Sequence, residues 1–202
     1  ACAAEGISRE QADAIVRGLV SEQGREVAIP GAVALREVLP AVPAGSPIDA
    51  AATGQEQSVS DGLRAAIGRD AEGPVVIDLV ADGPHALVTG VTGSGKSELL
   101  VSWVSALAAS YPAQQVSFVL ADFKGGTAFE PLRALPHVAA VITDLDAAGA
   151  ERGVHSLRAE LRRREGVLAE AGARSVTEAR GVLGRLVIVV DEFAALLQEH
   201  PD

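Results

Sequence analysis

A glycine-rich stretch, Gly90-Val91-Thr92-Gly93-Ser94-Gly95-Lys96-Ser97, fits the spacing G-x-x-x-x-G-K-[S/T] and constrains the fold more than any other feature of the chain. Glycines allow successive backbone N–H groups to turn toward one anion, and a helix that starts where the loop ends adds partial positive charge. The stretch therefore predicts a loop that binds the phosphates of a nucleotide such as ATP. Its candidate binding residues are Gly90, Val91, Thr92, Gly93, Ser94, Gly95, Lys96, Ser97 and Glu98.

Lys96 and Ser97 carry the chemistry expected of this loop. The Lys96 ammonium is expected to contact the β- and γ-phosphates, and the Ser97 hydroxyl to complete the shell of a Mg²⁺ ion. Glycine and serine also form ordinary turns, so the flanking sequence decides between the two interpretations. Residues 85–89 predict a short apolar strand before the loop, and residues 97–108 predict a mostly buried helix after it.

Two acids, Asp191 and Glu192, close the apolar run 186–190. Such a run is typical of a central parallel strand that presents acids at its carboxyl end. Asp191 is expected to hold Mg²⁺, and Glu192 to orient or deprotonate the attacking water, which makes Lys96 and Glu192 the candidate catalytic residues. Taken alone, the two acids fit a helix N-cap equally well. Together with the glycine loop they favour the nucleotide interpretation.

The remaining sequence alternates predicted helices and strands. We expect helices over 8–22, 32–39 and 146–171, a linker over 41–62, and strands over 74–79, 116–122 and 138–143. The strands over 74–79 and 85–89 are expected to pair as an edge hairpin. This order predicts an α/β fold with a doubly wound, mostly parallel sheet. Residues 1–61 then form a helical appendage with a linker, and residues 62–202 form a nucleotide-binding domain.

Two further groups of charged residues leave their roles open. Asp122 and Lys124 follow the strand 116–122 at the same predicted sheet edge as the glycine loop. They contact nucleotide, metal or a neighbouring subunit, or they form a salt-bridged loop that caps a helix beginning near Thr127. The run Arg162-Arg163-Arg164 is either a functional patch or a solvated helix face with i,i+4 partners such as Glu160.

Composition narrows the classes of function. The formal net charge of −10 argues against a broad, non-specific nucleic-acid surface, which needs clustered Lys and Arg. Cys2 is the single cysteine, so a reducing compartment is expected. No apolar run approaches the roughly 20 residues that span a bilayer. The sequence contains no methionine, which leads us to expect a piece of a longer protein.

An ordered set of motifs resembles the FtsK/SpoIIIE superfamily of hexameric ATPases and, within it, the type VII secretion ATPases EccC and EssC. The resemblance covers roughly residues 62 to 200. Its motifs are Gly83-Pro84-His85, the loop Gly90 to Ser97 with Glu98-Leu99-Leu100, Asp122-Phe123-Lys124-Gly125-Gly126, Leu135-Pro136-His137-Val138, Ser156 to Glu165, and Val189-Val190-Asp191-Glu192-Phe193.

This resemblance implies a RecA-like P-loop ATPase that uses ATP and Mg²⁺ to energise protein export. In the full protein it implies a ring, a hexamer in this superfamily, at the cytoplasmic face of the membrane. The implied partners are membrane components of the secretion system and small helical export substrates, reached through other domains. The family's later Gly-Arg segment and its strand ending in Thr-Gln are not in the chain. We therefore expect the arginine finger and the sensor elsewhere, and weak hydrolysis by this piece alone.

Two alternatives compete with the secretion motor. DNA-pumping members typically have Asp-Pro-Lys where this chain has Asp122-Phe123-Lys124, which makes a DNA translocase, and DNA as a partner, the less favoured interpretation. The form with Lys124 resembles the first of the several ATPase domains in secretion proteins. A nucleotide-binding assembly module without turnover is the second alternative, and intact Lys96 and Glu192 speak against it.

Overall fold

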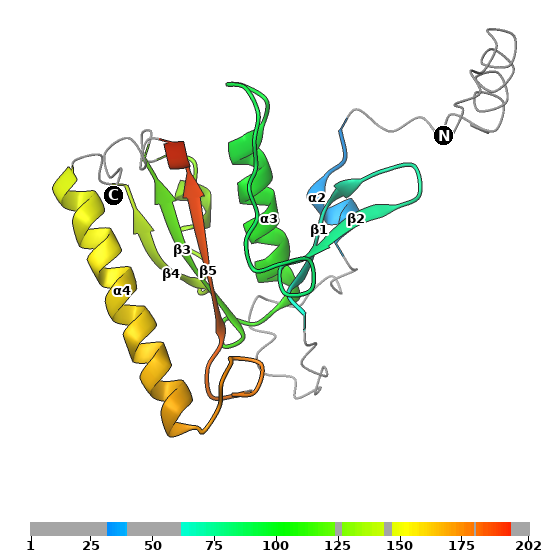
Figure 1. Ribbon diagram of the computed structural model, residues 1–202. Coiled ribbons are helices and arrows are strands. Elements are labelled where there is room, and N and C mark those ends of the chain that lie inside the picture. The colour runs from blue at the N-terminus through cyan, green and yellow to red at the C-terminus, as the bar shows by residue number, and fades with distance from the viewer. Residues whose placement is uncertain (1–31, 40–61, 124–126, 144–146, 180, 195–202) are drawn as a thin grey trace, which may run out of the picture.

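The computed structural model describes residues 32–39, 62–123, 127–143, 147–179 and 181–194. Its helices are α2 (Leu35–Val38), α3 (Lys96–Ser110) and α4 (Ala147–Glu170), with a 3₁₀ turn at Glu130–Leu132. Its strands are β1 (Arg64–Arg69), β2 (Pro74–Asp78), β3 (Val116–Asp122), β4 (Val138–Ile142) and β5 (Arg185–Asp191). Strands β1 and β2 form an antiparallel hairpin, and β4, β3 and β5, in that order, form a parallel sheet. Figure 1 shows α3 and α4 on opposite sides of this sheet.

Strand β3 is the central strand of the parallel sheet. Almost all of its residues are buried, as a continuous apolar run predicts for a strand covered on both faces. It aligns with β5 without a register shift, from Val116 opposite Arg185 to Asp122 opposite Asp191. The α/β fold with a parallel, doubly wound sheet is confirmed, and so are the predicted helices that became α3 and α4.

The core lies between α3 and the sheet face that α3 covers. Phe118 and Leu120 of β3 and Val104 and Leu107 of α3 are almost completely buried in one cluster. Alternate residues of a strand share a face, so Asp122 follows Phe118 and Leu120 on the α3 side. This packing fixes the helix that follows the glycine loop against the carboxyl ends of the strands.

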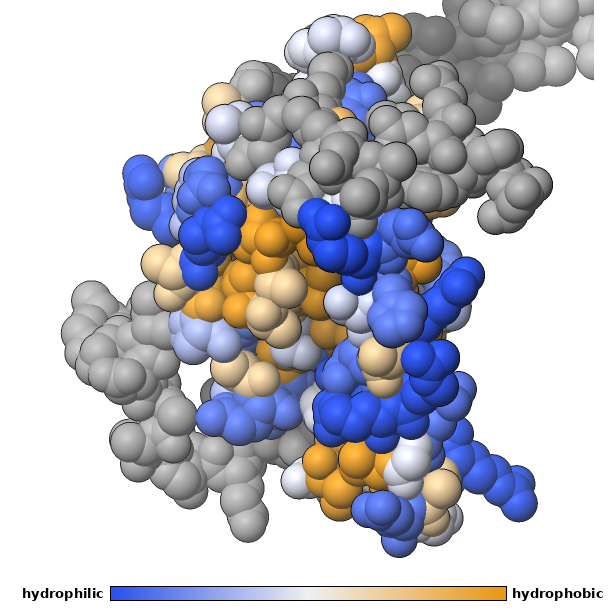
Figure 2. Space-filling model, turned by 90° about the vertical axis from the view of Figure 1, so that its left-hand side faces the viewer, coloured by the Kyte–Doolittle hydropathy of each residue, from blue (hydrophilic) through white to orange (hydrophobic). Residues whose placement is uncertain are grey.

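Helix α4 covers the opposite face of the sheet. Its Gly153 allows a close approach, because a Cβ there would lie 3.2 Å from Cδ1 of Ile142 on β4. Elsewhere the face is less filled: Ile188 of β5, aligned with Val119 of β3, is 42% exposed. Figure 2 looks at this side of the molecule and shows apolar surface beside a band of hydrophilic residues.

Two strand predictions around the glycine loop are wrong. Residues 85–89 form no strand, since no described strand hydrogen-bonds to them, and Leu87 is 79% exposed. The hairpin partner of β2 is consequently β1 rather than residues 85–89. The sequence of β1 carries no clear strand pattern, because Gly68 interrupts its alternation, and the structure has a register shift between Ala66 and Gly68 at this point.

The other differences concern short helices. A 3₁₀ turn at Glu130–Leu132 replaces the helix expected near Thr127, since Pro131 and Pro136 leave no room for a longer one. The helix expected over 32–39 is the single turn α2, which packs against β1. The helix expected over 8–22 and the linker, apart from Gly62, lie outside the described residues, so the domain boundary stays a prediction. Among the described helices none combines the length and apolar character needed to cross a membrane.

Candidate functional site

The glycine loop turns the chain from Thr89 into α3. Gly93 and Gly95 have φ angles of 79° and 88°, left-handed values that residues with a side chain rarely adopt. A Cβ on Gly90 would lie 2.5 Å from Oγ of Ser94, so a larger residue there would have to displace the Ser94 side chain. Gly95 is the N-cap of α3, and its carbonyl accepts the N–H of Leu99 at 2.9 Å. The loop thus ends on the positive end of a helix, as the sequence predicts.

Lys96 is folded back over the loop. Its Nζ donates hydrogen bonds to the carbonyl oxygens of Gly90 at 2.9 Å and Val91 at 3.1 Å. These bonds hold the ammonium beside the glycines, where a phosphate oxygen can replace the carbonyls as acceptor. The other candidate binding residues are exposed around the loop and on the first turn of α3: Val91, Thr92, Ser94 and Glu98.

Ser97 joins the loop to the end of β5. Its Oγ donates to Oδ2 of Asp191 at 2.6 Å, although the two residues are 94 positions apart in the chain. Asp191 is buried, at 7% exposure, on the face of the sheet that α3 covers. The structure therefore brings together the two residues from which the sequence predicts a Mg²⁺ site.

Glu192 follows Asp191 in an unusual backbone conformation. Its φ is 56°, and its N–H donates to Oδ1 of Asp191 at 3.0 Å. Left-handed conformations of non-glycine residues cost energy and are concentrated at functional sites. The chain becomes helical at Phe193, so the two acids also lie where the N-cap interpretation puts them. The Ser97 hydrogen bond favours the nucleotide interpretation, because capping requires no contact with the glycine loop.

The donor set suits a nucleotide phosphate with Mg²⁺. The helix end and the Lys96 ammonium favour an anion, whereas the Ser97 hydroxyl and the Asp191 carboxylate offer the oxygen ligands that a hard cation prefers. Gly90, Gly93 and Gly95 carry no side chain, which leaves the backbone of the loop open to close approach. The residues present therefore fit both groups.

Asp122 lies at the same edge of the sheet as Asp191. It is 4% exposed, and its Oδ2 accepts the N–H of Ala128 at 3.2 Å, so it holds the chain that follows β3. This bond agrees with the capping role considered for Asp122, although its target is a turn and not a helix. Lys124 lies outside the described residues.

The arginine run on α4 has mainly structural contacts. Arg163 bonds Glu160 through Nε and Nη2 at 2.7 and 2.8 Å. Arg164 bonds Glu160 through Nε at 2.8 Å and the carbonyl oxygen of Gly184 through Nη1 at 2.7 Å. The hydrogen bond from Arg163, followed by that from Arg164, lowers the pKa of the Glu160 carboxyl to about 2. Arg164 thereby links α4 to the chain that leads into β5, whereas Arg162 is exposed.

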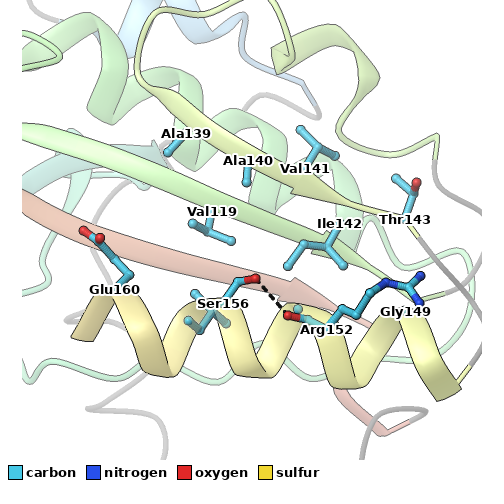
Figure 3. Close-up of a pocket in the computed structure, with 12 residues that line it drawn as sticks. Val119, Ala139, Ala140, Val141, Ile142, Thr143, Gly149, Arg152, Ser156 and Glu160 are labelled. Atoms are coloured by element: carbon cyan, nitrogen blue, oxygen red, sulfur yellow. Dashed lines mark hydrogen bonds between the residues drawn. The ribbon is translucent and has the colours of Figure 1, made fainter. Parts of the chain in front are cut away.

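A groove of about 420 Å³ lies between α4 and the sheet, on the face opposite α3. Figure 3 shows Val119 of β3 and Ala140 and Ile142 of β4 pointing toward α4. On α4 itself, the Oγ of Ser156 donates to the carbonyl oxygen of Arg152. None of the candidate nucleotide-binding residues lines this groove.

Ser97 of the glycine loop hydrogen-bonds to Asp191, which ends strand β5 of a parallel sheet. This arrangement defines a P-loop ATPase domain of the α/β class. Residues 49–198 match the model of the FtsK/SpoIIIE family, and the chain belongs to this family.

Curated relatives show which members of this family the chain resembles. EccC5 of the ESX-5 secretion system of Mycobacterium marinum is 39% identical over 132 residues, which cover 58% of this chain and 10% of that protein. The type VII secretion protein EssC of Staphylococcus aureus is 38% identical over 131 residues, 60% of this chain and 9% of that protein. The chain thus spans about a tenth of the length of these curated relatives.

A solved structure agrees with these relatives. Thermomonospora curvata EccC (ATPases 2 and 3), in complex with a signal sequence peptide, superposes with a TM-score of 0.66 at 32% identity. The superposition covers 83% of this chain and 32% of that one. The resemblance to type VII secretion ATPases is therefore confirmed.

Proposed function

We propose that this chain is an ATP-binding and ATP-hydrolysing motor domain that energises protein export through a type VII secretion system. The observation that carries the proposal is the 2.6 Å hydrogen bond between Ser97 and Asp191, which holds a hydroxyl and a carboxylate together beside the phosphate loop. The similarity to EccC5 and EssC supports export as the process that the domain drives.

The roles follow from the positions of the residues. The loop from Gly90 to Ser97 binds the phosphates of ATP, and Lys96 exchanges its carbonyl acceptors for phosphate oxygens. Ser97 and Asp191 hold Mg²⁺, which supplies positive charge against the phosphates when bound. Glu192 accepts a proton from the attacking water, whose oxygen bonds to the γ-phosphorus as the bond to the bridging oxygen breaks. The products are ADP and inorganic phosphate.

The partners are proposed by analogy with the relatives. A signal sequence peptide is present in the Thermomonospora curvata EccC structure, which supports exported proteins as partners of the full-length protein. We further propose a ring, with six subunits as in the superfamily, at the cytoplasmic face of the membrane. A neighbouring subunit would then supply an arginine to the transition state.

The experiment compares wild type with Glu192→Gln in the full-length protein. Glutamine keeps the size and hydrogen-bonding capacity of glutamate but cannot act as a base, so ATP still binds while turnover falls by about 10²-fold or more. Calorimetry measures binding, and phosphate release measures turnover. Near-normal turnover of the variant would show that Glu192 is only a capping residue.

Duplex DNA separates the export motor from a DNA translocase. Because the net charge of the chain is −10, we expect no stimulation of hydrolysis and no appreciable binding of duplex DNA at about 0.15 M salt. Micromolar, salt-sensitive binding with stimulated turnover would support the translocase instead. Tight ATP binding without any turnover by the full-length protein would support the assembly module.

A further inference from the structure

Two carboxylates lie side by side at the carboxyl edge of the parallel sheet. Asp122 is the last residue of β3 and Asp191 the last of β5, and the two are register partners. Neighbouring strands are roughly 5 Å apart. Phe118 and Leu120 precede Asp122 on the α3 face, and Val187 and Val189 precede Asp191 on the same face. Both carboxylates therefore lie on the sheet face that α3 covers, the same side as the glycine loop that leads into α3.

Burial distinguishes this pair from surface acids. Asp122 is 4% exposed and Asp191 is 7% exposed. The Asp191 carboxylate is occupied by Ser97 and by the N–H of Glu192, and the Asp122 carboxylate accepts the N–H of Ala128. Removal from water strengthens the field of a carboxylate, so a negative charge on Asp122 acts on its neighbour with little solvent screening.

We propose that Asp122 is a positioning residue whose negative charge, next to Asp191, strengthens the hold of Ser97 and Asp191 on Mg²⁺. The inference rests on the proposed nucleotide site and adds to it a residue from a third segment of the chain. Asp122 acts through its charge, from strand β3, on the metal site at the end of the neighbouring strand β5, and does not ligate the metal. A divalent ion beside Asp191 is attracted by both charges, whereas nucleotide without Mg²⁺ is repelled by both.

The hydrogen bond to Ala128 offers a competing role for Asp122, that of a simple anchor for the turn after β3. Two substitutions separate the roles. Asp122→Asn keeps an oxygen acceptor for Ala128 but loses the charge, whereas Asp122→Glu keeps the charge and displaces the acceptor. The charge role predicts that the Asn variant is impaired and the Glu variant is largely normal. The anchoring role predicts the reverse.

The test measures the affinity of the 202-residue chain for the slowly hydrolysed analogue ATPγS by calorimetry, once with excess MgCl₂ and once with EDTA. The ratio of the two dissociation constants is the Mg²⁺ enhancement. We expect Asp122→Asn to lower this enhancement about tenfold while the affinity in EDTA is unchanged or tighter. Asp122→Glu should retain most of the wild-type enhancement. A wild-type enhancement in the Asn variant, or a loss only in the Glu variant, would overturn the proposal.

Asp70→Asn is the matched control, because Oδ1 of Asp70 also accepts backbone N–H groups, those of Glu72 and Gly73, but in the exposed hairpin turn. It should leave the enhancement unchanged. Thermal melting establishes that each variant is folded, and Asp122→Ser replaces the Asn variant if that one is not. Failure of wild type to bind ATPγS at all would contradict the proposed function itself, whereas normal wild-type binding with an unaffected Asn variant contradicts only the role of Asp122.

Discussion

The two faces of the parallel sheet are built differently. Under α3, side chains such as Phe118 and Leu107 are almost completely buried, and the glycine loop, Ser97 and Asp191 meet at the edge of this packing. Under α4, a groove of about 420 Å³ lies between parts of the helix and the sheet, and Ile188 is 42% exposed. The hydrogen bond from Arg164 of α4 to the carbonyl oxygen of Gly184 supplements the packing on this face.

The difference shows which contacts position the chemistry. A close-packed interior transmits small displacements, so the position of α3 fixes the distance from the loop to the end of β5. We expect changes on the α4 face to leave these groups in place. Substitutions under α3 should therefore affect stability and nucleotide binding together, whereas substitutions under α4 should affect stability alone.

The largest expected effect is on the α3 face. Leu107 is 1% exposed, and Leu107→Ala should lower the free energy of unfolding by about 2–5 kcal/mol because it leaves a cavity. Ile188→Ala, on the other face, should cost roughly 1 kcal/mol or less and leave ATP affinity unchanged. Urea denaturation of both variants measures the costs. Equal costs would remove the distinction between the faces.

Arg164 provides the next test, on the α4 face. Arg164→Met should lower the free energy of unfolding by about 1–3 kcal/mol, because the carbonyl oxygen of Gly184 loses its charged donor. Arg163→Met is the matched control: its side chain is 55% exposed and pairs with the same Glu160, so its loss should cost less than about 1 kcal/mol. Urea denaturation compares them, and a control as costly as Arg164→Met would show that Gly184 contributes nothing.

The smallest effect concerns pH. Hydrogen bonds from Arg163 and then Arg164 lower the pKa of Glu160 to about 2, below its unfolded value. A depressed carboxyl pKa stabilises the fold above the unfolded pKa, and this contribution is lost as pH falls from about 4.5 toward 2. Because Glu160 is partly exposed, Glu160→Gln should cost only about 0.5–1 kcal/mol at neutral pH. The difference from wild type should shrink in acid, and a difference that is constant from neutral pH to about pH 3 would contradict this assignment.

The sequence predicted those parts of the fold that depend on local pattern. The buried runs that became β3, β4 and β5 and the long helix α4 were recognisable from composition and periodicity. Pairing was not, because it depends on residues distant in the chain. Residues 85–89 have strand composition but no described partner strand, and β1 has a partner but an interrupted pattern.

The candidate site was likewise predictable from the sequence only where the signal is local. Fixed spacing identified Lys96 and Ser97, and a strand-end position identified Asp191. The sequence could not show that Asp122 aligns with Asp191, because the register of β3 against β5 is a tertiary property. The left-handed backbone of Glu192 has no signal in the residue type either.

The most direct test of the proposed nucleotide site is the affinity of Lys96→Ala for MgATP, determined by calorimetry. Lys96 donates to the loop carbonyl oxygens of Gly90 and Val91, and we propose that its charge serves the phosphates of the nucleotide. The variant should remain folded and lose about 1.5–3 kcal/mol of binding free energy, roughly a 10- to 150-fold weaker affinity. Arg162→Ala, which removes a positive charge from an exposed position of α4, should bind as wild type. Unchanged affinity in a folded Lys96→Ala variant would contradict the assignment of this loop as the nucleotide site.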